Sequence, residues 1–158
     1  MTQIHEPGFS LNLPGEWGQA QTDQPGTLVY LETDGIGSVT VVLLAVRPMF
    51  AIADRSRLLG DYMQHRAEFE KGQMPSLEQS DPVAWDQDGA IEGSWSAIDL
   101  ESGIRQIHRV VMAGDILADF CYEATDLDVA EFAIRAAGVL DSAVVGDEPP
   151  EGSDQADS

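Results

Sequence analysis

Two β-rich runs decide the fold of this chain: Ile104-Arg-Gln-Ile-His-Arg-Val-Val-Met112 and Ile116-Leu-Ala-Asp-Phe-Cys-Tyr-Glu-Ala124. Only Ala113-Gly114-Asp115 separates them, so we expect the two runs to pair as a hairpin. Glycine at the first position of a two-residue loop suits a type II′ turn, whose twist matches that of the flanking strands. One face of the second run is almost wholly apolar, because alternate residues point the same way: Ile116, Ala118, Phe120 and Tyr122.

A helix is expected directly after this hairpin, over residues 126–143. Thr125 is placed to act as its N-cap, and Asp128 stands at the capping-box position, where Glu or Gln is usual. Apolar residues recur there at helical spacing and are predicted to pack on the sheet: Phe132, Ala136, Val139, Leu140 and Ala143.

The rest of the chain supplies shorter β-type runs and one more helix. The run 39–46 is apolar on both faces, which is typical of a central strand covered on both sides. Residues 72–81 are expected to form a loop. The elements predicted besides the closing hairpin and helix are strands at 9–13, 27–32, 38–46, 82–87 and 90–98, and a helix at 55–71 capped by Asp54. This order indicates an antiparallel sheet with segregated helices, the α+β class.

Length and composition favour one domain. The chain has 158 residues and 43% hydrophobic content, which is enough for a single core. Residues 1–146 are therefore predicted to form one domain. Residues 147–158 contain five acidic residues and no bulky apolar side chain, so we expect a disordered acidic tail.

The charge restricts the classes of partner. Eight Lys plus Arg residues stand against 28 Asp plus Glu residues, giving a formal charge of −20. Such a surface disfavours binding to nucleic acid or to an anionic membrane, so any charged partner is expected to be basic. The acidity also suits a purely solubilising role. No signal segment or membrane-spanning run is visible, since the longest apolar run is Val41–Val46, and the sequence predicts a soluble, cytoplasmic protein without membrane insertion.

No pattern of catalytic or metal-binding residues is evident in the sequence. The histidines at positions 5, 65 and 108 lie far apart, without the short spacings that metal sites favour, so no metal and no cofactor are predicted. Cys121 lies within a strand and is interpreted as a small core residue in preference to a nucleophile. The protein is therefore predicted not to be an enzyme, although an unrecognised pair of acidic residues is left open.

Five residues are candidates for contact with a partner. Arg105, His108 and Arg109 lie on one predicted strand and would form a basic patch on an acidic surface. The alternative is that Arg109 pairs with Asp119 or Glu123 across the hairpin. On the helix at 55–71, Tyr62 and Met63 continue an apolar stripe with Phe69, which is interpreted first as core and second as a partner groove.

The sequence also resembles a known superfamily. The resemblance rests on Phe9-Ser-Leu-Asn-Leu-Pro-Gly-Glu-Trp17, on the apolar strand 39–46 before a helix, on Gly89 between strands and on the closing strand and helix. Over residues 8–145 the chain resembles the PsbP/Mog-like superfamily, which includes a photosystem extrinsic protein and a yeast Ran-binding protein. The resemblance implies an antiparallel sheet of about six to seven strands flanked by helices on both faces, an α/β/α sandwich.

Members of this superfamily mostly act by binding. Among its bacterial members, the chain is similar in length and opening to the Eag-type chaperones of type VI secretion, which shelter apolar segments of effectors. The resemblance therefore implies a non-catalytic protein-binding module, an adaptor or a secretion chaperone. A carrier of a small or lipophilic ligand is the alternative.

Overall fold

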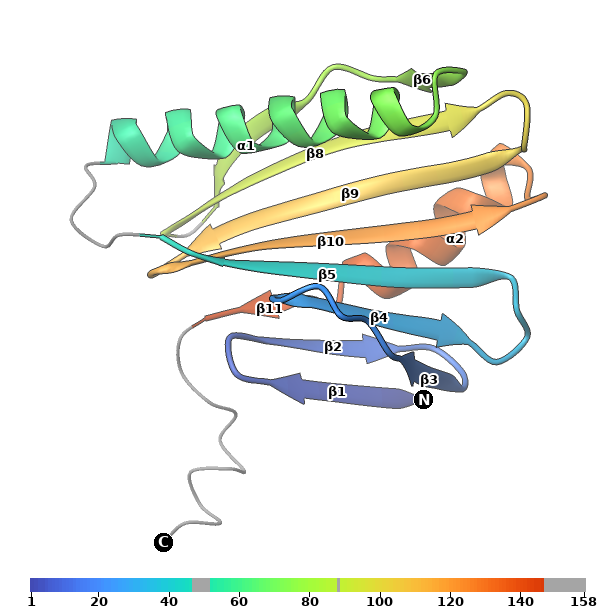
Figure 1. Cartoon of the computed structure of the whole chain (residues 1–158). Coiled ribbons are helices and arrows are strands. Elements are labelled where there is room, and N and C mark those ends of the chain that lie inside the picture. The colour runs from blue at the N-terminus through green and yellow to red at the C-terminus, as the bar shows by residue number, and fades with distance from the viewer. Residues whose placement is uncertain (47–51, 88, 147–158) are drawn as a thin grey trace, which may run out of the picture.

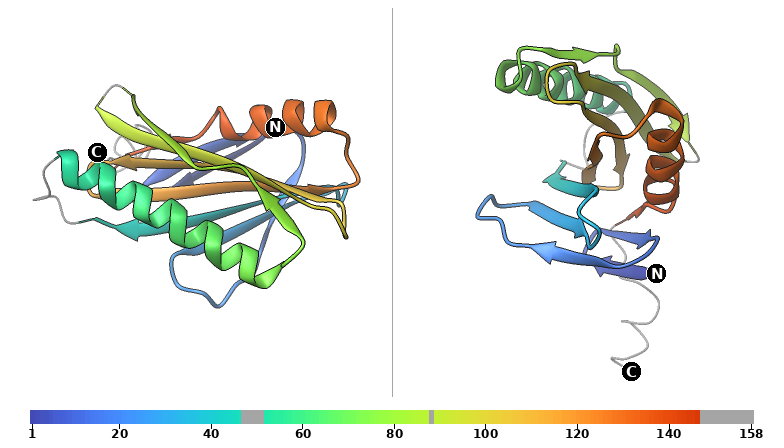
Figure 2. Two further views of the ribbon diagram at one scale, coloured as in Figure 1. Left: turned by 90° about the horizontal axis from the view of Figure 1, so that it is seen from above. Right: turned by 90° about the vertical axis from the view of Figure 1, so that its right-hand side faces the viewer.

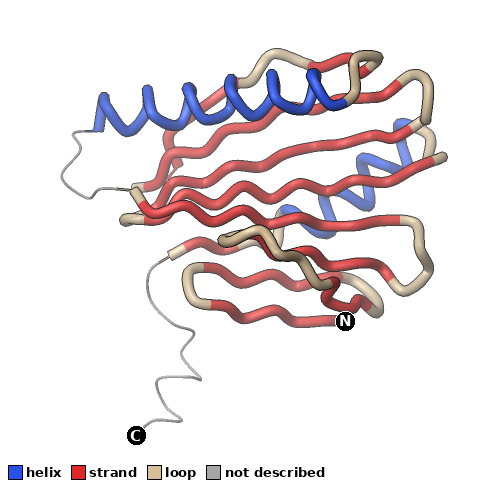
Figure 3. The backbone as a smooth tube through the Cα atoms, in the orientation of Figure 1, coloured by secondary structure: helices blue, strands red, loops and turns tan. Residues whose placement is uncertain are grey.

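The computed structural model describes residues 1–46, 52–87 and 89–146 (Figures 1 and 3). The predicted acidic tail lies outside these ranges. The strands are β1 (Thr2–Glu6), β2 (Phe9–Leu13), β3 (Trp17–Ala20), β4 (Thr27–Glu32), β5 (Gly37–Ala45), β6 (Leu77–Gln79), β7 (Val83–Gln87), β8 (Ala90–Asp99), β9 (Ile104–Ala113), β10 (Ile116–Thr125) and β11 (Val144–Val145). The helices are α1 (Ile52–Gln73) and α2 (Val129–Leu140). Within the described residues, neither helix is long and apolar enough to cross a membrane.

The strands form two antiparallel sheets. The larger has eight strands in the order β3-β4-β5-β10-β9-β8-β6, with β7 also paired to β8, and the smaller has the order β1-β2-β11. The α+β class is confirmed. The prediction of one sheet with six to seven strands is wrong, because the structure has two sheets and the larger has eight strands. Strands as brief as β6 (3 residues) and β11 (2 residues) show little periodicity, and β6 lies where a loop was expected.

The central hairpin forms as predicted. Ala113 pairs with Ile116, which leaves Gly114 and Asp115 as the turn. Gly114 has a φ of 59°, whereas Asp126 is the only non-glycine with positive φ among the described residues. A positive φ at the first turn position alone matches the type II′ turn.

Alternate residues of the central strands pack against different helices. Phe120 and Tyr122 of β10 belong to the core that contains Phe132 of α2. Leu117, which points the other way, packs in a second core with Leu59 of α1. Figure 2 shows the two helices on different sides of the large sheet.

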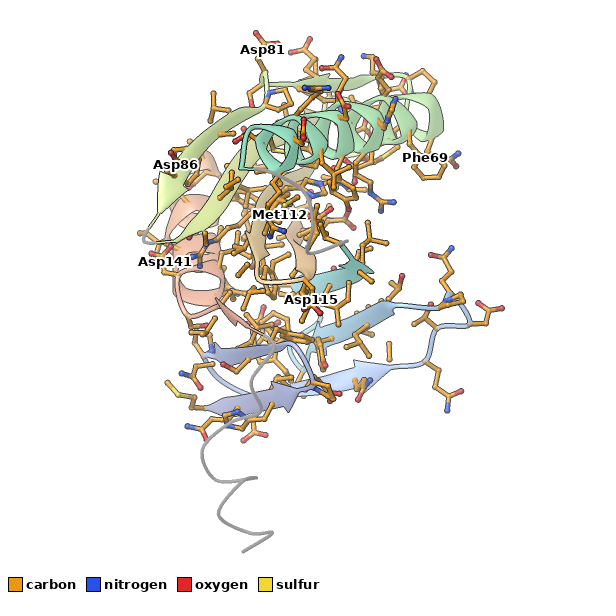
Figure 4. The ribbon with its side chains drawn as sticks, turned by 90° about the vertical axis from the view of Figure 1, so that its left-hand side faces the viewer. Phe69, Asp81, Asp86, Met112, Asp115 and Asp141 are labelled. Carbon is orange, nitrogen blue, oxygen red and sulfur yellow. The ribbon has the colours of Figure 1, made fainter. Side chains whose placement is uncertain are left out.

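Helix α1 faces the sheet with a stripe that includes Met63, as expected, but departs from the expected stripe at Phe69. Leu59, Met63 and Ala67 are buried, as is Glu70, whereas Phe69 is 56% exposed. The spacing of four and three residues along the buried stripe leaves Phe69 beside it, so its predicted inward position is wrong. In Figure 4 Phe69 lies at the edge of α1 remote from α2, and the guanidinium carbon of Arg66 is 5.4 Å from its ring centroid.

Strand β5 occupies the predicted central position, between β4 and β10. Val39 and Val41 are fully buried, but Leu44 is 44% exposed. Helix α1 packs over β6, β7, β8 and β9 and leaves Leu44 of β5 exposed. The expectation that both faces of β5 are covered is therefore wrong at Leu44.

Asp128, not Thr125, caps helix α2. The Asp128 carboxylate accepts a hydrogen bond from the backbone N–H of Glu131 at 2.8 Å, and the helix begins at Val129. The predicted start at residue 126 is wrong because Asp126 has a φ of 64°, outside the helical region. The helix also ends at Leu140, earlier than expected, although Ala143 is buried beyond it.

The cap can be tested with two alanine substitutions. Asp128→Ala is expected to lower the free energy of unfolding by about 1 kcal/mol, because it removes a hydrogen bond to an otherwise unpaired helix N–H group. Thr125→Ala, at the position first expected to be the cap, should change it by less than about 0.5 kcal/mol. Urea denaturation of both variants measures the difference, and the reverse order would mean that the helix begins earlier.

Candidate functional site

A buried polar cluster lies beneath α1, with His108 at its centre. His108 of β9 and Asp119 of β10 are each 1% exposed, and Glu70 of α1 is 7% exposed. The Nδ1 atom of His108 lies 2.8 Å from Oδ1 of Asp119, and its Nε2 atom lies 3.1 Å from Oε1 of Glu70. One imidazole thus links two strands of the sheet to the helix that covers them.

Two aromatic residues fix the orientation of this cluster. The hydroxyl of Tyr62 donates a hydrogen bond to Oδ2 of Asp119 at 2.6 Å. The ring of Trp95, the cross-strand partner of His108, stacks on the imidazole with centroids 3.8 Å apart and 8° between the planes. Packing and hydrogen bonding together hold the ring in one rotamer.

The partners of the imidazole favour its charged form. Burial alone lowers the pKa of His108, but the neighbouring Cys121 and the Asp119 carboxylate raise it well above its usual value. Burial, followed by the Asp119 charge, raises the pKa of Tyr62, so this hydroxyl stays a donor. Burial also raises the pKa of the Cys121 thiol. The cluster is therefore an imidazolium held between two carboxylates beneath the helix.

A cleft of about 920 Å³ lies between α2 and the strands β6 to β9. Its helical wall is apolar and its strand wall carries polar and charged side chains. The residues that line it include Glu78, Trp85, Glu92, Arg105, Arg109, Val129, Phe132, Ala133, Ala137 and Asp141. In Figure 4 the labelled Asp141 marks the end of α2.

Arg109 is tied into the wall of this cleft. Its Nε and Nη2 atoms donate to the two carboxylate oxygens of Glu92 at 3.0 and 3.2 Å. Its Nη1 atom donates to the carbonyl oxygens of Leu140 at 2.6 Å and Ala143 at 3.2 Å. Arg109 therefore anchors the C-terminal end of α2 to the sheet and has little capacity left for a ligand.

Arg105 has more capacity for a ligand. Its Nε atom donates to the carbonyl oxygen of Leu127 at 3.2 Å. Its terminal nitrogens have no hydrogen-bond or ion-pair partner within residues 1–46, 52–87 and 89–146. These donors line the cleft and can meet a carbonyl or carboxylate oxygen of a bound molecule.

The predicted basic patch does not form as one surface. Arg105 and Arg109 share a face of β9 and both line the cleft, whereas the side chain of His108 bonds to Glu70 and Asp119 beneath α1. The reason is the two-residue period of a strand, which turns position 108 away from 105 and 109. A binding role for these residues stays a prediction.

The alternative pairing of Arg109 with Asp119 or Glu123 is also wrong. Arg109 pairs with Glu92 on the neighbouring strand, Asp119 pairs with His108, and Glu123 accepts a hydrogen bond from Gln106 at 2.7 Å. Asp119 and Glu123 both lie on one face of the hairpin, and Arg109 lies on the other.

Of the two candidates on α1, Met63 is an interior residue and Tyr62 is half-buried at the edge of the same core. Met63 is 2% exposed and packs in the core beneath the helix, while the Tyr62 hydroxyl is held by Asp119. This agrees with the first interpretation of their stripe, as core.

The sequence reasoning missed Glu70 and Glu92, and it missed the pairing of Asp119 with His108. A usable signal was present for that pair. A two-residue turn at 114–115 fixes the register of the hairpin, which places Cys121 opposite His108 and puts Asp119 on the same face. An acidic residue on such an apolar strand needs a buried partner.

Comparisons with known proteins identify the fold. A scan against protein-family models found no match for this chain, and no curated protein matched it either. Among solved structures, the chain is similar to cyanobacterial PsbP (CyanoP) from Synechocystis sp. PCC 6803, with a TM-score of 0.69, 14% identity and coverage of 92% of both chains. A structure from Bacteroides thetaiotaomicron VPI-5482 has a TM-score of 0.48 and 15% identity, covering 95% of this chain and 49% of that one. The chain thus has a PsbP-like fold, as the resemblance implied.

Proposed function

We propose that this protein is a non-catalytic binding module, which receives an apolar segment of a partner protein in the cleft between α2 and strands β6 to β9. It would act as an adaptor or in the manner of an Eag-type secretion chaperone. The apolar wall of the cleft carries the proposal. A cytoplasmic location and the absence of catalysis stay predictions from the sequence.

The apolar wall consists of a row of exposed residues on α2. Val129, Ala133 and Ala137 lie four positions apart, and all three line the cleft. Val129 is 64% exposed, and Trp85 on the opposite side of the cleft is 41% exposed. Small side chains on a helix allow another backbone to approach closely, while an exposed tryptophan offers a large contact area at low entropic cost.

Charge supports a partner segment with basic flanks. The acidic residues Glu78 and Asp141 lie exposed in the lining of the cleft, and the whole chain carries −20. The free donors of Arg105 would meet a carbonyl oxygen of the segment. Acidic surroundings raise the association rate of a basic partner, and apolar contacts then hold it.

A carrier of a lipophilic small molecule is the second candidate. The cleft volume of about 920 Å³ falls within the usual range of small-molecule sites, roughly 300–1,000 Å³. Such a carrier, purified under native conditions, should release a lipophilic compound on solvent extraction, detectable by mass spectrometry.

Two arginine substitutions on neighbouring positions of α2 test the proposal. Ala133→Arg places a long cationic side chain in the cleft, whereas Ile134→Arg places the same group at a site that is 73% exposed and outside the lining. The full chain and both variants are immobilised and exposed to native cell extract, and the affinity of the retained protein is then measured with purified components. Ala133→Arg should weaken binding at least tenfold, and Ile134→Arg should leave it within about twofold.

The same experiment gives results that exclude the proposal. If the unaltered chain retains no protein above background, the binding module itself is rejected. If both variants bind equally well, or lose binding to the same degree, the partner contacts another surface.

A further inference from the structure

Three side chains of metal-ligand type converge beneath α1. Glu70 comes from the helix, His108 from β9 and Cys121 from β10, and one ligand atom from each lies within 4.8 Å of the other two. These ligand atoms are buried, and Cys121 is the only cysteine in the chain. The side chains of these residues lie on the α1 side of the sheet, whereas the proposed partner site uses the α2 side, although His108 also belongs to the lining of the cleft.

The second layer of contacts orients His108 for ligation. Its Nδ1 atom donates a hydrogen bond to Asp119 at 2.8 Å, and Asp119 also accepts a hydrogen bond from the hydroxyl of Tyr62 at 2.6 Å. A carboxylate that holds one ring nitrogen fixes the tautomer and leaves the other for a metal, the usual arrangement around zinc. Stacking on Trp95 keeps the Nε2 atom aimed at Glu70.

We propose that Glu70, His108 and Cys121 bind a zinc ion through Oε1, Nε2 and Sγ. The Nε2 and Oε1 atoms are 3.1 Å apart. Two ligands placed at about 2.1 Å from a tetrahedral ion are about 3.4 Å apart, so the observed separation needs only a small adjustment. Three protein ligands leave the fourth position for water.

The ligand set selects among metals. A thiolate, an imidazole and a carboxylate together suit zinc, whereas magnesium and calcium prefer oxygen ligands alone and copper(I) prefers sulfur.

Proton release balances the charge of the ion. Without metal, the imidazolium of His108 lies between two carboxylates and Cys121 is a thiol. Binding of Zn²⁺ displaces one proton from Nε2 and one from Sγ, and both pass to solvent. The two added positive charges replace two protons, so the net charge beneath the helix is unchanged.

Cobalt(II) is a direct probe of this site, because a cobalt–thiolate bond absorbs in the near ultraviolet and the chain has one cysteine. The full reduced chain, stripped with a chelator, is titrated with Co²⁺ and then with Zn²⁺. We expect a charge-transfer band that saturates at one equivalent and disappears when Zn²⁺ is added. Zn²⁺ should also raise the melting temperature.

Variants separate this site from binding elsewhere. Cys121→Ser should abolish the band and the zinc-dependent rise in melting temperature, and Glu70→Gln should weaken Co²⁺ binding at least tenfold. His65→Asn, which alters an exposed histidine of the same helix, should keep both signals. Circular dichroism checks that each variant is folded. Absence of the band in the unaltered chain, or an unchanged affinity in folded Glu70→Gln, would overturn the proposal.

Discussion

Asp119→Ala is expected to lower the free energy of unfolding by about 3–5 kcal/mol, because it removes one partner of a buried charged pair. Asp119 is 1% exposed and accepts hydrogen bonds from His108 and Tyr62. Alanine would leave the Nδ1–H group of the imidazole and the tyrosine hydroxyl without this acceptor, in a region from which water is excluded. Chelator-treated protein should be used, so that no bound metal contributes.

Urea denaturation with two control variants isolates the cause. Asp119→Asn keeps an acceptor for Nδ1–H but loses the charge, so its loss should be smaller than that of alanine. Asp54→Ala breaks an exposed ion pair with Arg57, 3.2 Å long, and should have little effect, since such pairs contribute about 0–1 kcal/mol. A loss below about 1 kcal/mol for Asp119→Ala would mean that water or another group replaces the carboxylate.

The local parts of the fold were predictable because short-range chemistry determines them. Gly114 supplies the positive φ that a type II′ turn requires, and this turn sets the register of β9 against β10. The stripe of Phe132, Ala136 and Val139 follows from helical periodicity and is buried. The same reasoning misplaced the N-cap, since both Thr125 and Asp128 are good capping residues and the backbone at Asp126 decides between them.

The candidate sites depend on contacts between elements that are far apart in sequence. Glu70 and His108 are 38 positions apart and meet only because α1 lies at a particular height and rotation over the sheet. The sequence pattern placed Phe69 on the buried face of α1, but the buried residue is its neighbour Glu70. This error of one position conceals the pairing of Glu70 with His108. The cleft likewise depends on where α2 ends relative to β8, which the contacts of Arg109 with Glu92 and Leu140 hold in place.

Phe132→Ala tests the docking of α2 and is expected to cost about 3–5 kcal/mol. Phe132 is 8% exposed and packs on Tyr122, with ring centroids 5.5 Å apart. Truncation removes the contacts of a large ring and opens a space next to it. Because Phe132 also lines the cleft, this space can connect to solvent, so the loss should lie toward the lower end of that range.

Ile134→Ala is the matched control on the same helix. Ile134 is 73% exposed, so its truncation should change the free energy of unfolding by less than about 0.5 kcal/mol. Urea denaturation of both variants gives the comparison, and an unchanged denaturant slope would show that the unfolded state is unaffected. If Phe132→Ala cost less than about 1 kcal/mol, α2 would not dock through this ring. The cleft beside it would then need a different wall, and the partner site proposed there would lose its apolar side.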